Sequence, residues 1–144
     1  MRIVSVKRTV QKRLITEFGE KCSMTDEAIR WNTFIDDICS RDLSVLTEIQ
    51  KEAVLCFWYD AEMNSAGHCG YFDCYPDTVP EELVSALTKV ADKSFADNYL
   101  KALEEIKDED NGFEDTDDAF YSFEPSLTDH LMSFVENHKD EIFC

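Results

Sequence analysis

The stretch TEIQKEAVLCFWYDAEMN, residues 47–64, decides whether this chain is built from helices or around a sheet. Its centre, AVLCFWY, is a run of apolar residues rich in β-formers, and by itself it fits a buried strand. Thr47 and Gln50 instead have the spacing of a capping box, which marks the start of a helix. The charged first turn and the length of the stretch favour the same choice. We therefore expect a helix that is buried on most of its sides.

Helical periodicity extends over most of the remaining chain. Apolar residues recur at three- and four-residue spacing in four further segments, namely residues 25–40, 78–92, 94–110 and 126–143. Thr25, Thr78 and Ser94 stand where the first three of these helices need an N-cap. Only four glycines and three prolines occur in 144 residues, and 44% of the chain is apolar. We expect a mainly α fold, a single-domain bundle of six or seven helices with a glycine-rich structured loop in the middle.

The charge of the chain is strongly negative and unevenly distributed. The net charge is −17, yet residues 1–21 carry six Lys or Arg and only two Asp or Glu. Ile3, Val6, Val10 and Leu14 have helical spacing, so we expect a basic N-terminal helix there, although the opening RIVSV also alternates like a strand. The remaining residues carry a net −21, which repels nucleic acid and anionic membranes and attracts basic proteins. The simpler explanation is that this charge only keeps the protein soluble.

The motifs of common enzyme and cofactor sites are missing from the sequence. It contains no G-x-x-x-x-G-K-[ST], G-x-G-x-x-G, G-x-S-x-G or H-E-x-x-H, so we expect no cofactor and predict that the chain is not an enzyme. His68, Cys69 and Cys74 approach the spacing of zinc ligands, but a fourth ligand would have to come from a distant segment, and we expect packing cysteines and no metal. No apolar run is long enough to span a membrane or to form a signal core, so we expect a cytoplasmic protein with free thiols.

The glycine-rich loop is expected in EMNSAGHCGYFDCYP, residues 62–76. Gly67 and Gly70 are two of the four glycines in the chain, and they suit the backbone angles that end a helix. We expect Glu62 and Asn64 to hold the loop in place, with the Glu62 carboxylate accepting hydrogen bonds from the backbone N–H groups that follow it. We expect the aromatic side chains of the loop to anchor it in the core; these are Tyr71, Phe72 and Tyr75.

An acidic segment spans residues 104–118, where nine residues are acidic and only Lys107 is basic. Its acids are Glu104, Glu105, Asp108, Glu109, Asp110, Glu114, Asp115, Asp117 and Asp118. Carboxylates three and four positions apart on a helix lie about 5–6 Å from each other. This spacing approaches the charge density of B-DNA, which carries one negative charge per about 1.7 Å of its axis. We expect the acidic segment to bind a partner, and an ordinary solvated helix end and loop is the alternative.

Two groups of residues, one in the middle of the chain and one towards its C-terminus, form a recognisable signature. The first group lies in the central stretch and comprises Glu62, Asn64, Gly67, His68, Gly70, Tyr71 and Phe72. The second lies towards the C-terminus and comprises Asp117, Phe120, Tyr121, His138 and Phe143. Together they resemble the DNA mimic protein 19 family over residues 42–143, with a departure where NSAGH replaces a contiguous Asn-Gly-Gly. The resemblance implies a mainly helical, often dimeric fold, a structural role for the first group, and a type member that imitates the charge of DNA and binds a helix-turn-helix repressor.

Three functions are consistent with these observations. The first is an acidic protein-interaction module, a DNA-mimicking regulator that binds a basic protein such as a helix-turn-helix transcription factor. The second is an immunity-type protein that neutralises a basic toxin enzyme. The third is an enzyme with a pocket at Glu62, Asn64 and His68. We favour the first function. We expect a single acidic helical domain over residues 1–144 that forms a homodimer and binds neither nucleic acid nor membranes.

Overall fold

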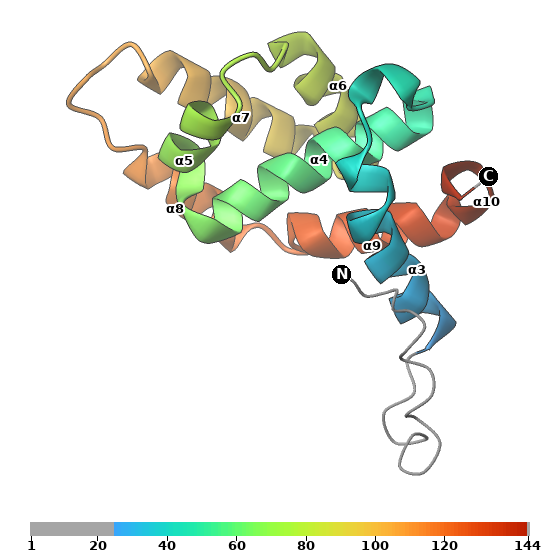
Figure 1. Cartoon of the computed structure of the whole chain (residues 1–144). Coiled ribbons are helices and arrows are strands. Elements are labelled where there is room, and N and C mark those ends of the chain that lie inside the picture. Colours follow the sequence, from blue (N-terminus) through green and yellow to red (C-terminus); the bar gives the residue numbers. More distant parts are fainter. Residues whose placement is uncertain (1–24, 144) are drawn as a thin grey trace.

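Every secondary-structure element that the structure describes is helical (Figure 1). The structure is a computed structural model and describes residues 25–143, so the basic helix expected over residues 1–21 lies outside the described residues. The elements are α3 (Asp26–Asp36), the 3-10 turns η1 (Ile38–Ser40) and η2 (Leu43–Val45), α4 (Glu48–Ser65), α5 (Gly67–Cys74), α6 (Pro80–Val90), α7 (Lys93–Glu105), α8 (Glu114–Ser122), α9 (Leu127–Asn137) and α10 (Lys139–Ile142). The predicted mainly α bundle is confirmed.

Helix α4 lies at the centre of the bundle and packs on α6 and on α9 (Figure 1). It begins with the predicted capping box, because Thr47 Oγ1 accepts from the Gln50 N–H at 3.3 Å and Gln50 Oε1 accepts from the Thr47 N–H at 2.9 Å. Its completely buried apolar side chains are Ala53, Val54, Cys56, Tyr59 and Met63. A helix surrounded by other helices is apolar on most of its sides, which explains the continuous run AVLCFWY. The alternative of a buried strand is therefore wrong.

Helices α6 and α7 pack on each other, and α6 also covers one side of α4. The residue before each helix differs from the predicted N-cap. Val79, not the predicted Thr78, is the N-cap residue of α6. The Thr78 hydroxyl does not cap the helix, because it donates to the Tyr75 carbonyl in the preceding turn, at 3.1 Å. Asp92 caps α7 by accepting from the Ser94 N–H at 2.9 Å, so Ser94 lies inside the helix. The prediction of an N-cap at Thr25 is confirmed, since its hydroxyl accepts from the Ala28 N–H at 3.0 Å.

The central stretch contains helix α5 in place of the expected glycine-rich loop. Helix α4 ends at Ser65 and α5 begins at Gly67, with only Ala66 between them. Gly67 makes this abrupt change of direction with φ +75°, a left-handed conformation that favours glycine. Gly70 leaves room for the Ala66 side chain at the junction, since a Cβ at residue 70 would lie 2.4 Å from the Ala66 Cβ. Because α5 and the short α10 are additional elements, the described residues form eight α-helices rather than six or seven.

The aromatic side chains of this stretch anchor α5 in the core, as predicted. Tyr71 is 2% exposed, and its ring centroid lies 5.0 Å from that of Tyr59 in α4. The Tyr71 hydroxyl lies 3.0 Å from Thr78 Oγ1, so its polar end is also satisfied. Phe72 and Tyr75 are half-buried and pack against the same core. The position of α5 is therefore fixed by packing along its inner face.

Candidate interaction surface

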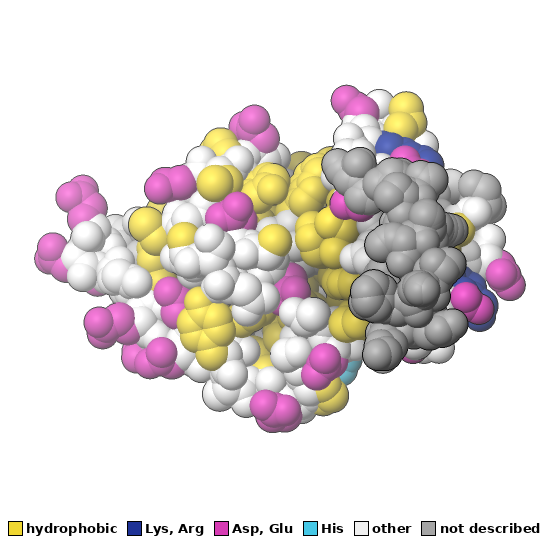
Figure 2. All heavy atoms as spheres, turned by 60° about the horizontal axis from the view of Figure 1, so that its bottom comes forward, with side chains coloured by type: hydrophobic (Ala, Val, Ile, Leu, Met, Phe, Trp, Pro, Cys, Tyr) yellow, Lys and Arg dark blue, Asp and Glu magenta, His cyan; other side chains and the backbone are white. Residues whose placement is uncertain are grey.

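The acidic segment lies at the end of the molecule where α7 leads into α8 (Figure 1). Figure 2 shows acidic side chains gathered around this end. Seven of its nine acids are exposed, namely Glu104, Asp108, Glu109, Asp110, Glu114, Asp115 and Asp118. Glu105 and Asp117 are half-buried. The segment therefore divides into side chains that face solvent and side chains that face the protein.

Some of the exposed acids are used locally. Glu104 pairs with Lys107, with 3.1 Å between Oε1 and Nζ. Asp108 accepts a hydrogen bond from the Asp110 backbone N–H at 3.0 Å, which shapes the loop between α7 and α8. The remaining five exposed acids make no ion pair with any residue that the structure describes, and we call them the outward carboxylates: Glu109, Asp110, Glu114, Asp115 and Asp118.

Three of the outward carboxylates lie on one side of α8. Asp118 follows Asp115 by three positions and Glu114 by four, so the three side chains are neighbours on the helix surface. Glu114 and Asp115 are in the first turn of α8, where the positive end of the helix dipole stabilises negative charge. This placement offsets part of the repulsion among like charges, and it gives the surface a defined helical spacing.

Asp117 points the other way, towards the start of α5. Its Oδ1 accepts two hydrogen bonds from His68, one from the backbone N–H at 3.0 Å and one from Nδ1 at 2.8 Å. Its Oδ2 lies where a side chain on Gly67 would have to be, only 2.5 Å from the position of a Cβ. The carboxylate therefore occupies a space that exists because residue 67 is glycine.

His68 is completely buried, and both of its ring nitrogens are used. Its Nε2 lies 2.6 Å from the hydroxyl of Tyr59, which is itself completely buried. Burial lowers the pKa of His68, although Asp117 acts in the opposite direction, and burial raises the pKa of Tyr59. A neutral imidazole with its proton on Nδ1 satisfies this arrangement, because it donates to Asp117 and accepts from the Tyr59 hydroxyl.

The second half-buried acid, Glu105, holds α8 against α7. Its Oε1 accepts from the Thr116 hydroxyl at 2.8 Å. The amide of Asn98 in α7 donates to the Thr116 carbonyl at 2.8 Å. These contacts show why an acid at the C-terminal end of α7, where the helix dipole disfavours negative charge, is retained by the fold.

Glu62 and Asn64 do not hold the central stretch in the predicted way. Asn64 donates to the carbonyl and carboxylate of Asp60, within its own helix, at 2.9 and 3.1 Å. The Glu62 carboxylate accepts no hydrogen bond from the backbone of residues 64–70 among the contacts of the described chain, and its Oε1 lies beside Gly70. Burial and the charge of Glu62 raise the pKa of Cys74. The physical reason is that the residues after Gly67 form a helix, and a backbone N–H at the start of that helix donates to Asp117 instead.

The pocket required by the alternative of an enzyme, at Glu62, Asn64 and His68, is not formed. His68 is buried with both ring nitrogens bonded, Asn64 is exposed, and Glu62 is half-buried against α5. The three side chains therefore do not converge on an open cleft. Sequence reasoning also missed the link from Tyr59 through His68 to Asp117. The presence of His68 and Asp117 in the two signature groups is the one sequence signal that connects them.

Comparison with known protein families gives a direct match. The family model of the DMP19-like protein matches residues 44–138. The chain belongs to the DMP19-like family. Neither a curated protein nor a solved structure matches it.

The match agrees with the resemblance predicted over residues 42–143. Within the described residues, the region shared with DMP19-like proteins contains α4 to α9 complete, with the link between His68 and Asp117. Helix α3 precedes it and α10 follows it. The residues that shape the acidic end of the molecule therefore all belong to the family region.

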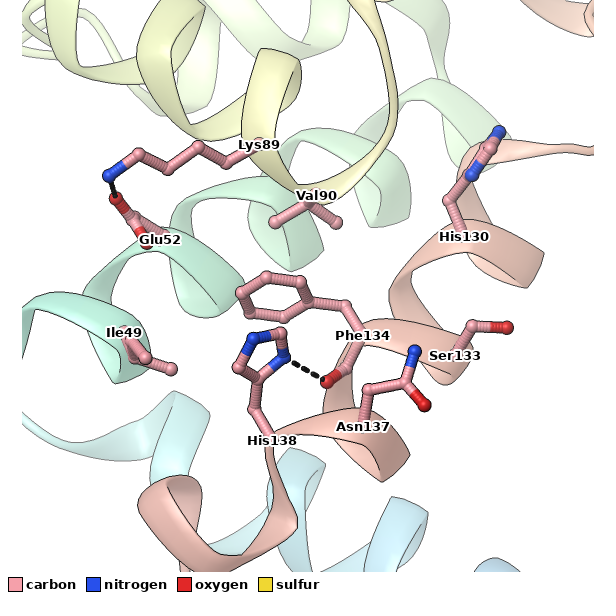
Figure 3. Close-up of a pocket in the computed structure, with 9 residues that line it drawn as sticks. All are labelled: Ile49, Glu52, Lys89, Val90, His130, Ser133, Phe134, Asn137 and His138. Carbon is pink, nitrogen blue, oxygen red and sulfur yellow. Dashed lines mark hydrogen bonds and ion pairs between the residues drawn. The ribbon is translucent and has the colours of Figure 1, made fainter.

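A pocket of about 550 Å³ lies elsewhere on this DMP19-like protein (Figure 3). Its lining comprises Ile49, Glu52, Lys89, Val90, His130, Ser133, Phe134, Asn137 and His138. Lys89 Nζ lies 2.6 Å from Glu52 Oε2, and the two form an ion pair on one wall. His138 Nδ1 lies 3.0 Å from the Phe134 carbonyl oxygen, and the two rings are in contact. Of the candidate residues from the sequence, only His138 of the family signature lines this pocket.

Within residues 25–143, no group of three or more His, Cys, Asp or Glu side chains is placed to hold a metal ion. His68 could not serve as a ligand without losing its bonds to Tyr59 or Asp117. None of the described helices is both long and apolar to the degree that crossing a membrane requires.

Proposed function

We propose that this DMP19-like protein binds a basic, DNA-binding protein by presenting the outward carboxylates in place of DNA phosphates. The observation that carries the proposal is the set of five exposed carboxylates, without cationic partners among the described residues, at one end of a family member whose net charge is −17. A transcription factor of the helix-turn-helix class has a positively charged face of the kind that this surface would occupy.

The spacing of the outward carboxylates supports this proposal. Glu114, Asp115 and Asp118 are neighbours on one side of α8, and Glu109 and Asp110 lie in the loop before it. A basic protein reads a row of phosphates mainly through charge and position, without needing the bases. Complementary charge also accelerates the encounter of the two proteins, so binding of this kind is sensitive to salt.

Apolar groups beside the carboxylates support a protein partner in particular. Tyr121 of α8 is 52% exposed, and its hydroxyl donates to the Met63 carbonyl, so the ring is held at the surface. Ile106, at the end of α7, is 47% exposed. Exposed aromatic and aliphatic side chains next to a charged rim are typical of protein–protein interfaces.

Capture of the partner tests the proposal. The purified protein is used as bait in a lysate of its native cell at low salt, and bound proteins are identified by mass spectrometry. We expect a basic DNA-binding protein, and a basic toxin enzyme would instead favour the immunity function. A bait with Glu114→Gln, Asp115→Asn and Asp118→Asn should lose the partner. A control bait with Asp26→Asn, Glu27→Gln and Asp36→Asn removes the same charge from exposed positions on α3 and should retain it.

Equal loss of the partner from both baits would contradict a defined surface, because it would mean that only total charge matters. The cytoplasmic location and the homodimer stay predictions. The apparent mass of the purified protein in solution tests whether it is a dimer.

A further inference from the structure

We infer that Asp117 is a positioning residue of the proposed surface, which fixes α8 on the junction of α4 and α5 so that the outward carboxylates are held in one arrangement. That the carboxylates held in this way bind a partner rests on the proposed function. The contacts that carry it belong to the described chain and do not depend on a partner. It separates Asp117 from the acids beside it, although the sequence places all of them in one acidic segment.

The first observation is that Asp117 caps a helix to which it does not belong. Helix α5 has no side-chain cap of its own, since Ala66 occupies its N-cap position. Asp117 accepts from the N–H of His68, the second residue of α5, as an N-cap residue does. The carboxylate also accepts a hydrogen bond from Nδ1–H of the same residue, so two hydrogen bonds to a charged acceptor join α8 to α5.

The second observation is that the space around Asp117 is shaped for its carboxylate. A Cβ at Gly67 would lie 2.5 Å from Oδ2 and 3.0 Å from Cγ of Asp117. The Asp117 side chain is 22% exposed and lies beside a completely buried imidazole. The imidazole in turn is fixed by the Tyr59 hydroxyl at 2.6 Å from its Nε2. Gly67 and the backbone and ring of His68 therefore surround the Asp117 carboxylate and determine its position.

The third observation is that the inward contacts of α8 determine which way its other side chains face. Phe113, just before α8, packs on Phe72 of α5 with ring centroids 5.6 Å apart. Thr116 is bonded to α7 through its hydroxyl and its carbonyl, and Phe120 is buried in the core. Phe113, Thr116, Asp117 and Phe120 recur at three- and four-residue spacing, so they form one inward stripe. With this stripe fixed, Glu114, Asp115 and Asp118 face outwards.

Two adjacent substitutions with the same change in charge test the inference. In Asp117→Asn, amide hydrogen exchange should rise about tenfold or more in α8 and in the first turn of α5, as expected for loss of charged hydrogen bonds. Exchange in α6 should be unchanged. The Nδ1 NMR signal of His68 should also shift, because a neutral amide oxygen is a weaker acceptor than a carboxylate. In Asp118→Asn, which removes an exposed carboxylate, both readouts should match the unmodified protein.

A third variant keeps the experiment decisive if Asp117→Asn folds poorly. Asp117→Glu preserves the charge but places the carboxylate one methylene further from the backbone, out of position for its two hydrogen bonds from His68, so we expect the same rise in exchange within α8. Identical behaviour of the Asp117 and Asp118 variants, a uniform rise over all helices, or unmodified behaviour of Asp117→Glu would overturn the inference. None of these readouts uses a partner, so failure to capture one would count against the proposed function alone.

Discussion

At the residue scale, the central feature is a buried histidine that the fold requires to be neutral. His68 donates from Nδ1 to Asp117 and accepts at Nε2 from Tyr59, so a second proton on Nε2 would require the Tyr59 hydroxyl to turn away. A protonated imidazole would make the Tyr59 hydroxyl, which is completely buried, an acceptor and leave its hydrogen without its present partner. The chemistry at this position is therefore structural and sensitive to pH.

This arrangement predicts how stability depends on pH. Burial lowers the pKa of His68 below its usual 6.5, so the unfolded chain binds this proton more readily than the folded protein does. The free energy of unfolding should be unaffected by this group above pH 6.5 and should fall as the pH decreases below it, by at most about 1.4 kcal/mol per pH unit for one proton. Urea unfolding of the protein and of His68→Gln between about pH 7.5 and 5.5 measures this.

The variant is the control for the other titrating groups. His68→Gln should be less stable at neutral pH and should show a weaker dependence on pH over this range, because residue 68 no longer titrates. Equal slopes for the two proteins would mean that His68 does not contribute to the loss of stability in acid.

At the element scale, the sequence predicts helices whose signals are local. The capping box at Thr47 and Gln50 and the length of its stretch correctly indicate α4, although the apolar run at its centre also fits a strand. Helix α5 has no local signal of this kind, since it begins with Gly67 and has no capping side chain of its own. Its cap is Asp117, which lies 49 positions further along the chain than His68. A stretch stabilised by such a contact resembles a loop when only its own residues are considered.

The junction of α4 and α5 gives a prediction with a matched control. Gly67→Ala should lower the free energy of unfolding by about 2 kcal/mol, because an alanine at φ +75° costs about 1–2 kcal/mol and its Cβ also displaces Asp117. Gly112→Ala should change stability by no more than about 0.5 kcal/mol, since a Cβ there meets nothing within 4 Å. Urea unfolding of the two variants measures the difference, and equal losses would contradict the role given to Gly67.

Contacts between distant parts of the chain also limit what the sequence predicts about the candidate surface. Composition alone indicates the acidic segment, and seven of its nine acids are exposed as a surface requires. The two exceptions, Glu105 and Asp117, differ from their neighbours only in the partners that they meet, Thr116 and His68. The spacing of the nine acids among themselves does not distinguish these two, because their partners are set by the packing of α8 on α7 and α5.

At the scale of the whole molecule, the fold places packing and charge at different locations. The core surrounds α4, whereas the outward carboxylates belong to α8 and its preceding loop, at one end of the molecule (Figure 1). Membership of the DMP19-like family and a net charge of −17 are consistent with charge mimicry, but a large negative charge also serves solubility. The two explanations differ in whether the position of the charges matters.

The affinity for the captured partner as a function of salt decides between them most directly. Calorimetric titration from about 50 to about 500 mM NaCl spans the range over which exposed charges become screened. We predict that affinity falls steeply with salt, and that Glu114→Gln, Asp115→Asn and Asp118→Asn together weaken binding and flatten this dependence, whereas the α3 control variant does neither. An affinity that is the same at low and high salt, or equal effects of the two sets of substitutions, would contradict the account.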